Sequence, residues 1–206
     1  MLRLFYSTGS CALASHIALE EAGADYEAVR VNLAAGEQRA PEFLGVNPKG
    51  RVPALVSDRG VLTETPAILA FIAQAFPAAG LAPLDDPFAF AELQAFNSYL
   101  CSTVHPAYAH SRRGPRWADE AASIEDMKRK APKNLAEQFE LIETTMFAGP
   151  WVTGAAYSIA DPYLFTLTDW MGPLGVDLSR CPRVVDHHAR MRERPAVRKV
   201  LAAHAG

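Results

Sequence analysis

The stretch Asn47-Pro48-Lys49-Gly50-Arg51-Val52-Pro53-Ala54-Leu55 is followed closely by Leu62-Thr63-Glu64-Thr65-Pro66. The first piece is typical of a turn that leads into a strand through an X-Pro bond, and the second of a strand that ends at a helix cap. Together they offer a peptide-like ligand a strand edge with free backbone groups and a helix N-terminus that favours a carboxylate. Cys11 lies upstream at the head of another predicted helix, so the same unit also carries a thiol.

Composition and charge exclude several classes of protein. The chain has 206 residues, 50% hydrophobic and 21% charged, which is enough to form one large domain or two small ones with packed cores. A net charge of −3 argues against a nucleic-acid partner. The start Met1–Tyr6 lacks the apolar run of a signal peptide, and no stretch approaches the roughly 20 apolar residues that span a bilayer. These features predict a cytoplasmic protein with no membrane partner.

Cysteine and histidine spacing argues against a metal site. Cys11, Cys101 and Cys181 are widely separated, form no C-x-x-C pair and suit a reducing compartment. The histidines show no H-E-x-x-H spacing, and the adjacent pair His187-His188 points to different faces of a helix. We therefore expect no metal cofactor, and we read His187-His188 as a solvated polar face.

The first 77 residues alternate between strand and helix patterns. The predicted elements are a strand at Leu2–Tyr6, a helix at Cys11–Ala22, a strand at Tyr26–Leu33, a short helix at Pro41–Val46, strands at Ala54–Ser57 and Val61–Thr63, and a helix at Glu64–Phe76. This βαβ-α-ββα order predicts an α/β domain with a mixed four-stranded sheet. The βαβ unit implies a parallel pair, and the Asp58-Arg59-Gly60 turn implies an antiparallel hairpin.

The remainder of the chain has helical periodicity. Residues 78–87 are rich in proline, lack periodicity and are predicted to be a linker. Residues 88–206 are predicted to form an all-α domain with helices at Phe88–His105, Asp119–Met146 (with a break at Pro132), Ala160–Met171, Pro182–Arg192 and Pro195–His204. Ala160–Met171 is apolar over most of its surface, so it is expected to be the buried central helix.

Cys11 is the first candidate for chemistry. A thiolate at a helix start is stabilised by the helix dipole and by unpaired N–H groups, which predicts a lowered pKa for this cysteine. The alternative is a small buried apolar residue. Ser10 in the preceding turn and Tyr6 at the strand end can hydrogen-bond a bound thiolate. Their structural alternatives are a helix cap for Ser10 and a core position for Tyr6.

The second set of candidates is a ligand-binding edge. If Val52-Pro53 is cis, Val52 presents its backbone N–H and C=O to a peptide-like ligand; the alternative is an ordinary loop proline. Thr65 can hold a ligand carboxylate at a helix N-terminus, and Glu64 can hold an ammonium group; simple capping is the alternative for both. His105 becomes a site residue only if its helix faces the Cys11 turn.

The segment Ser158-Ile159-Ala160-Asp161 has a structural role. It is a capping box with Asp in place of Glu, in which Ser158 caps and Asp161 reaches back to the N–H of the cap residue. We expect it to start the buried helix and to take no part in catalysis.

Together these motifs resemble the cytosolic glutathione transferases, over essentially the whole chain. The resemblance is carried by Phe5-Tyr6, Cys11-Ala12-Leu13-Ala14-Ser15-His16, Asn47–Leu55, Thr63-Glu64 and Ser158-Ile159-Ala160-Asp161. The Cys11–His16 run is similar to the bacterial beta class in particular. The resemblance implies a thioredoxin-like N-terminal domain, an all-helical C-terminal domain, glutathione as co-substrate and a homodimer.

The resemblance also implies individual roles. Val52, before a cis Pro53, would bind the cysteinyl backbone of glutathione, and Glu64 and Thr65 would hold its γ-glutamyl end. Cys11 would lie beside the glutathione sulfur.

The resemblance implies further roles for residues of the helical domain and of the turn before Val52. His105 would approach the glutathione sulfur, and Ser102, one turn earlier, would line the same wall. Arg51 would supply positive charge near the ligand.

Two departures from the beta-class pattern affect the binding of glutathione. Beta-class members often carry a lysine near the glycyl carboxylate of glutathione. In this chain that region is Ala34-Ala35-Gly36, and the nearest basic residues in the sequence are Arg30 and Arg39. Beta-class members usually have an asparagine two turns before the active-site histidine. This chain has Ser98 at that position, with Asn97 beside it.

The resemblance implies conjugation of the glutathione thiolate to hydrophobic electrophiles, as in detoxification. The candidate walls of the electrophile site are Phe5, Tyr108, Trp117 and Phe165. Thiol–disulfide exchange or reductive dehalogenation through Cys11 is one alternative. A non-catalytic binding or stress protein on the same fold is another.

Overall fold

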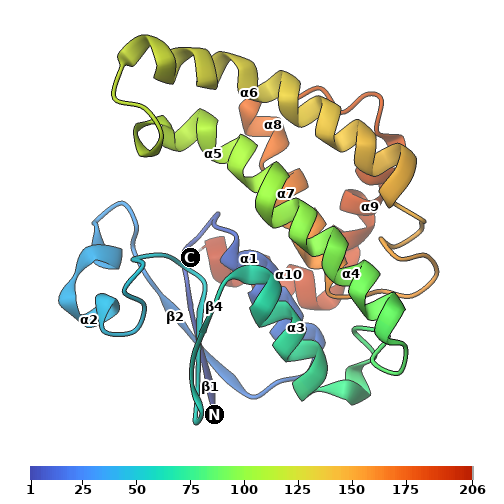
Figure 1. The fold of residues 1–206 in the computed structure, drawn as a ribbon. Helices are drawn as coiled ribbons and strands as arrows, with labels where there is room; N and C mark the ends of the chain where they lie inside the picture. The colour runs from blue at the N-terminus through green and yellow to red at the C-terminus, as the bar shows by residue number, and fades with distance from the viewer. Residues whose placement is uncertain (206) are drawn as a thin grey trace.

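The N-terminal domain is built on a mixed four-stranded sheet (Figure 1). The computed structural model describes residues 1–205. The elements of this domain are β1 (Leu2–Tyr6), α1 (Ala12–Glu21), β2 (Tyr26–Arg30), η1 (Glu37–Arg39), α2 (Pro41–Leu44), β3 (Ala54–Ser57), β4 (Gly60–Thr63) and α3 (Thr65–Ala75). The strand order is β2-β1-β3-β4, with β1 and β2 parallel and the other pairs antiparallel. The predicted sheet is confirmed.

The centre of the sheet forms the core of this domain. Leu4 of β1 is opposite Ala28 of β2 and Leu55 of β3, and both leucines are fully buried. Helices α1 and α3 lie side by side between the sheet and the helical domain (Figure 1). Every residue of α1 from Ala12 to Leu19 is buried, because its other face packs against α7 and α10. This two-sided burial explains why α1 lacks a polar face.

The C-terminal domain is helical throughout. Its elements are α4 (Pro87–Tyr99), η3 (Leu100–Val104), α5 (His105–Arg113), η4 (Gly114–Arg116), α6 (Ala121–Leu141), η5 (Ile142–Met146), α7 (Ala160–Asp169), α8 (Met171–Leu174), α9 (Pro182–Glu193) and α10 (Pro195–Ala205). Asp86 caps α4 by accepting hydrogen bonds from the N–H groups of Phe88 and Ala89 at 2.9 and 3.0 Å. Pro87 in the first turn needs no such partner. The segment before α4 contains one short 3-10 helix, η2 (Pro77–Ala79).

The structure corrects three predicted boundaries. The helix expected to end at His105 continues into α5 through the π-helical segment η3, whose wider turns accommodate Pro106, which has no N–H to donate. Helix α6 runs through Pro132 without a break. Strand β2 ends at Arg30, and the chain then turns at Asn32, whose side chain accepts hydrogen bonds from the N–H groups of Ala34 and Ala35.

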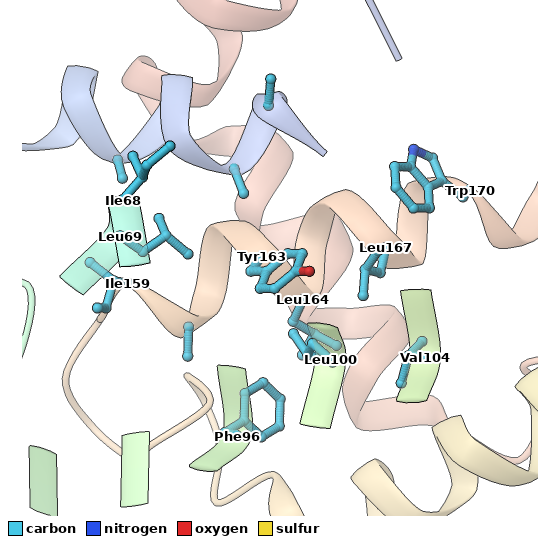
Figure 2. Close-up of a cluster of buried hydrophobic side chains, with 14 of the residues drawn as sticks. Ile68, Leu69, Phe96, Leu100, Val104, Ile159, Tyr163, Leu164, Leu167 and Trp170 are labelled. Atoms are coloured by element: carbon cyan, nitrogen blue, oxygen red, sulfur yellow. The ribbon is translucent and has the colours of Figure 1, made fainter. Parts of the chain in front are cut away.

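The two domains share a continuous hydrophobic core. Figure 2 shows Ile68 and Leu69 of α3 close to α7, with Phe96 of α4 and Leu100 and Val104 of η3 on the opposite side of α7. All residues of α7 from Ala160 to Thr168 are buried, so the predicted central helix is confirmed. Helix α7 therefore packs against elements of both domains.

The start of α7 holds the predicted capping box. Asp161 is fully buried and accepts hydrogen bonds from the Ser158 N–H at 2.7 Å, the Ser158 hydroxyl at 3.1 Å and the Val152 N–H at 2.8 Å. His187 lies 3.0 Å from the same carboxylate and is also fully buried. The expectation that His187 belongs to a solvated face is therefore wrong. His188 is half-buried, stacked on Phe165 and bonded to Asp169.

In the described part of the chain, no helix combines the length and hydrophobicity needed to cross a bilayer.

Candidate functional site

A cavity of about 910 Å³ lies between the two domains. This volume is in the range of small-molecule sites. All of the predicted site residues except Tyr6 and Ser102 line it, namely Ser10, Cys11, Arg51, Val52, Pro53, Glu64, Thr65 and His105. Residues from the β1–α1 turn, the segment before β3, the start of α3 and the start of α5 thus converge on one space.

Cys11 occupies the N-cap position of α1, makes no side-chain capping hydrogen bond and is only partly exposed. Its Sγ lies 3.5 Å from the carbonyl oxygen of Val52, to which the thiol donates. Burial raises the pKa of Cys11 to about 11, and a hydrogen bond with Thr65 offsets this only in part. The predicted lowering of this pKa is therefore wrong, because desolvation of the thiolate outweighs the stabilisation that the helix start offers. Cys11 is held as a neutral thiol.

Ser10 is engaged as a turn and cap residue. Its hydroxyl donates to the carbonyl oxygen of Ser7 at 2.6 Å and accepts from the N–H of Ala12 at 3.3 Å. The hydroxyl faces the cavity while tied to the backbone on both sides, which fixes the shape of the β1–α1 turn.

The segment before β3 presents free backbone to the cavity. The Val52-Pro53 bond is cis, as the resemblance implied. No hydrogen bond within residues 1–205 uses the Val52 N–H, while the Val52 carbonyl accepts from Cys11. An extended ligand can therefore pair with this N–H.

Glu64 and Thr65 stand at the start of α3. Glu64 has φ +71°, a conformation that costs a non-glycine residue about 1–3 kcal/mol and that proteins retain mainly at functional sites. Its carboxylate forms an ion pair with Lys49 at 2.5 Å, and Lys49 also donates to the Thr63 hydroxyl at 2.7 Å. Nothing in the sequence pairs Lys49 with Glu64, because the β3–β4 hairpin separates them. Thr65 is buried.

His105 reaches the cavity from the helical side. Burial lowers its pKa to about 4, and the positive charges of Arg116 and Arg51 act in the same direction. Its ring meets the edge of Trp170 at a centroid distance of 5.1 Å, and Trp170 is stacked on Tyr108 at 4.5 Å. His105 is therefore neutral near pH 7 and can act there as a hydrogen-bond donor.

Two family models match the chain: glutathione S-transferase N-terminal domain over residues 2–74, and glutathione S-transferase C-terminal domain over residues 96–195. The chain belongs to the glutathione S-transferase family. This transferase is 31% identical over 205 residues to glutathione S-transferase GstA of Escherichia coli O157:H7, with 98% of each chain covered.

Solved structures agree with this assignment. A glutathione transferase homologue from Sulfitobacter with bound glutathione has a TM-score of 0.94 and 41% identity, over 98% of both chains. The bacterial beta-class glutathione S-transferase of Sphingomonas chungbukensis has a TM-score of 0.85 and 35% identity, again over 98% of both chains. The predicted enzyme family, fold and beta-class resemblance are confirmed.

Two predicted site residues of the transferase lie outside the cavity. Tyr6 is buried, with its ring 4.6 Å from that of His204 and 5.1 Å from that of His16. The structure therefore favours the alternative interpretation of Tyr6 as a core residue. Ser102 is exposed, and the neighbouring Cys101 lines the cavity instead.

The predicted electrophile walls are only half right. Tyr108 and Trp117 line the cavity of the transferase, together with Trp170. Phe165 is fully buried in a separate core cluster, and Phe5 packs edge-on against Phe43, so neither is a wall.

Arginines are the main feature of the site that no sequence motif indicates. Six of them line the cavity: Arg30, Arg39, Arg51, Arg112, Arg113 and Arg116. Desolvation lowers the pKa of Arg116, and the nearby charges of Arg51, Arg113 and Arg39 lower it further. The arginines of this cluster come from both domains, so no local sequence motif reveals that they lie together. Within residues 1–205, no group of three or more His, Cys, Asp or Glu side chains is arranged to hold a metal ion.

Proposed function

We propose that the transferase binds glutathione in the cavity between its domains and conjugates the glutathione sulfur to an electrophile. One observation carries this proposal: the cavity brings Cys11, Val52, Glu64, Thr65 and His105 together, although they come from both domains. The solved Sulfitobacter homologue, 41% identical, has glutathione bound.

The charges of the cavity suit the three parts of glutathione. The N–H of Val52, which has no partner within residues 1–205, would bind the cysteinyl carbonyl. Glu64 would bind the γ-glutamyl ammonium, and the start of α3 at Thr65 its carboxylate. Arg39 and Arg51 would bind the glycyl carboxylate and take over the role of the missing lysine.

The reacting sulfur would lie between Cys11 and His105. The thiol of glutathione loses its proton to solvent, and the resulting thiolate attacks the electrophilic carbon as the leaving group departs with its electron pair. A neutral His105 donates a hydrogen bond to the thiolate, and the neutral Cys11 thiol does so when its proton turns from the Val52 carbonyl toward the glutathione sulfur. The raised pKa of Cys11 favours this role over that of an attacking thiolate in disulfide exchange.

Assembly and location are part of the proposal. We propose a homodimer in the cytoplasm, with an interface near the start of α4. Phe88 is 74% exposed there, and Val61 on the edge strand β4 is 43% exposed. An interface that covers these two side chains would remove them from water.

The proposal is tested by thermal unfolding with reduced glutathione. Saturation at about 100 times the dissociation constant is expected to add roughly 2.7 kcal/mol of stability. Cysteinylglycine, which lacks the γ-glutamyl group, is expected to give little shift. Glu64→Gln is expected to weaken glutathione binding about tenfold, whereas Glu42→Gln, at an exposed position outside the cavity, is expected to leave it unchanged.

Catalysis is measured separately with 1-chloro-2,4-dinitrobenzene. Cys11→Ala is expected to keep glutathione binding and part of the conjugation rate, because His105 still supports the thiolate. Complete loss of conjugation with binding intact would favour the Cys11-centred exchange chemistry. The absence of any glutathione-dependent shift at millimolar concentration would refute the proposed function.

A further inference from the structure

The electrophile side of the cavity combines arginines with aromatic rings. Arg112 and Arg113 end α5, and Arg116 and Trp117 follow within the next turn. These four residues and Tyr108 line the cavity from the helical domain, whereas the groups assigned to glutathione come mainly from the N-terminal domain. One short segment therefore forms most of the wall that a second substrate meets.

No carboxylate of residues 1–205 pairs with the arginines on this wall. Within residues 1–205, none of the six cavity arginines forms an ion pair or donates a side-chain hydrogen bond. Glu64 is the only carboxylate among the described residues that line the cavity, and it is paired with Lys49. Glutathione brings two carboxylates and one ammonium, a net charge of about −1 at pH 7. Bound glutathione therefore leaves most of the arginine charge uncompensated.

Arg116 lines the same cavity as His105. The charge of Arg116 lowers the pKa of His105, and Arg51 and Arg113 act on Arg116 in turn, so these groups lie within electrostatic range of one another. A guanidinium binds a carboxylate through two parallel hydrogen bonds and stacks on aromatic faces. An anion held here would lie close to the sulfur that His105 supports.

The aromatic residues set the shape of the ligand. Tyr108 and Trp170 are stacked with an interplanar angle of 27°, and both line the cavity. Trp117 is 48% exposed although it lines the cavity, and His110 packs against its ring in a T-shaped arrangement at a centroid distance of 4.5 Å. The exposed part of the Trp117 ring can contact a planar partner.

We propose that the second substrate is a planar aromatic electrophile that carries a carboxylate, with its ring against Tyr108 and Trp117 and its anion on Arg113 and Arg116. The turnover part of this inference rests on the proposed function, but the binding part does not. In the reaction, a C–S bond forms to the ring, the bond to a halide breaks, and the halide leaves with the electron pair. The proton of the glutathione thiol passes to solvent.

Binding is tested with 4-nitrobenzoate and its neutral analogue 4-nitrobenzamide. Nitroaromatic rings quench tryptophan, and Trp117 and Trp170 line the cavity, so both ligands are followed by fluorescence. The anion is expected to bind at least tenfold more tightly at low ionic strength, and the preference is expected to shrink in 1 M salt because the exposed charges are screened.

Variants of the helical domain test whether its arginines cause the preference for the anion. Arg113→Gln and Arg116→Gln are each expected to reduce the preference about threefold to tenfold, and the double variant to remove it. Arg59→Gln, in the exposed β3–β4 turn, is the matched control and is expected to change nothing. Equal affinity for the two ligands, or a preference that survives in the double variant, would overturn the inference. So would a preference lost in Arg39→Gln alone, because the anion would then occupy the glutathione side.

Turnover is compared for 4-chloro-3-nitrobenzoate and its methyl ester, each relative to its uncatalysed rate with glutathione. A kcat/KM about tenfold higher for the acid, lost in the Arg113→Gln/Arg116→Gln variant with an unchanged KM for glutathione, supports the inference. Equal kcat/KM values overturn it and leave the proposed function standing. If neither compound is conjugated but nitrobenzoate still binds through Arg113 and Arg116, the turnover part of the inference fails and the anion site remains; the proposed function is then judged by the glutathione and 1-chloro-2,4-dinitrobenzene assays alone.

Discussion

Replacement of Asp161 by alanine is expected to cause a large loss of stability. The carboxylate of Asp161 is fully buried at the start of α7 and accepts hydrogen bonds from both the N–H and hydroxyl of Ser158, from the Val152 N–H and from His187. Asp161→Ala leaves these donors in place without their acceptor. The hydroxyl can rotate to another partner, but two backbone N–H groups and the imidazole cannot.

The size of the stability loss follows from the number of buried donors that Asp161→Ala leaves without an acceptor. Each buried donor left without a partner costs about 1–3 kcal/mol, and removal of one partner from a buried charged network typically costs about 3–5 kcal/mol. We expect Asp161→Ala to lower the free energy of unfolding by about 4 kcal/mol. For a chain of this length, 1 kcal/mol corresponds to a shift of about 2–4 °C, so Tm should fall by about 8–16 °C.

Asp161→Asn separates the lost hydrogen bonds from the lost volume. The amide has the same shape and keeps one acceptor oxygen, but its NH₂ group faces donors on the other side. We expect roughly half of the alanine effect, about 2 kcal/mol. The control is Asp177→Ala, because Asp177 is exposed and accepts from Ser179 N–H at 2.9 Å; its Tm should not change measurably.

The assay is urea unfolding followed by circular dichroism, with Tm measured in parallel. A loss below about 1 kcal/mol for Asp161→Ala would refute the reasoning, since it would show that water or rearranged backbone satisfies the stranded donors. An asparagine variant less stable than the alanine variant would also contradict it.

Two further predictions follow from pKa shifts. The pKa of Cys11 is raised to about 11, so peptide mapping after iodoacetamide treatment should show a labelling rate at Cys11 that still rises steeply with pH above 9; a plateau near pH 8 would contradict this. His16 and His204 lie 2.9 Å apart, and burial lowers the pKa of each to about 4. Because these folded-state values are below the unfolded value of 6.5, the stability present above pH 6.5 is lost as the pH falls toward 4, by about 2 kcal/mol per histidine at pH 5. His204→Phe, which keeps the ring contact with Tyr6, should flatten the fall in Tm between pH 7 and 5, and an unchanged slope would count against the histidine pair as its cause.

The parts of the site that the sequence predicts are those carried by contiguous motifs. Val52, Glu64 and Thr65 were recognisable because turn, strand and helix-cap signals follow one another within a single stretch. Cys11 was recognisable from its place after a strand and before a helix. Its pKa was not, because burial by residues from other segments raises it, and the helix start alone suggests the opposite direction.

The helical domain shows the limits of one-dimensional patterns. Helix α7 was predicted to be buried because it is apolar on nearly all sides, and the fold bears this out. His187 was misread because its polarity suggests a solvated face, whereas Asp161, 26 residues away, supplies its buried partner. Phe5 and Phe165 look like candidate walls in the sequence, but packing directs both into the core.

Local periodicity and turn chemistry specify the order of the elements, the mixed sheet, the central helix and the position of the binding edge, so all of these can be predicted from the amino-acid sequence. Which side chains share the cavity, and what charge they create there, depends on how the two domains pack together. Arg39 and Arg51 come from the N-terminal domain and Arg113 and Arg116 from the helical domain, and the docking of the two domains places them around one space. Electrostatic energy depends on the distance between charges and on their burial, and neither quantity can be read from the amino-acid sequence.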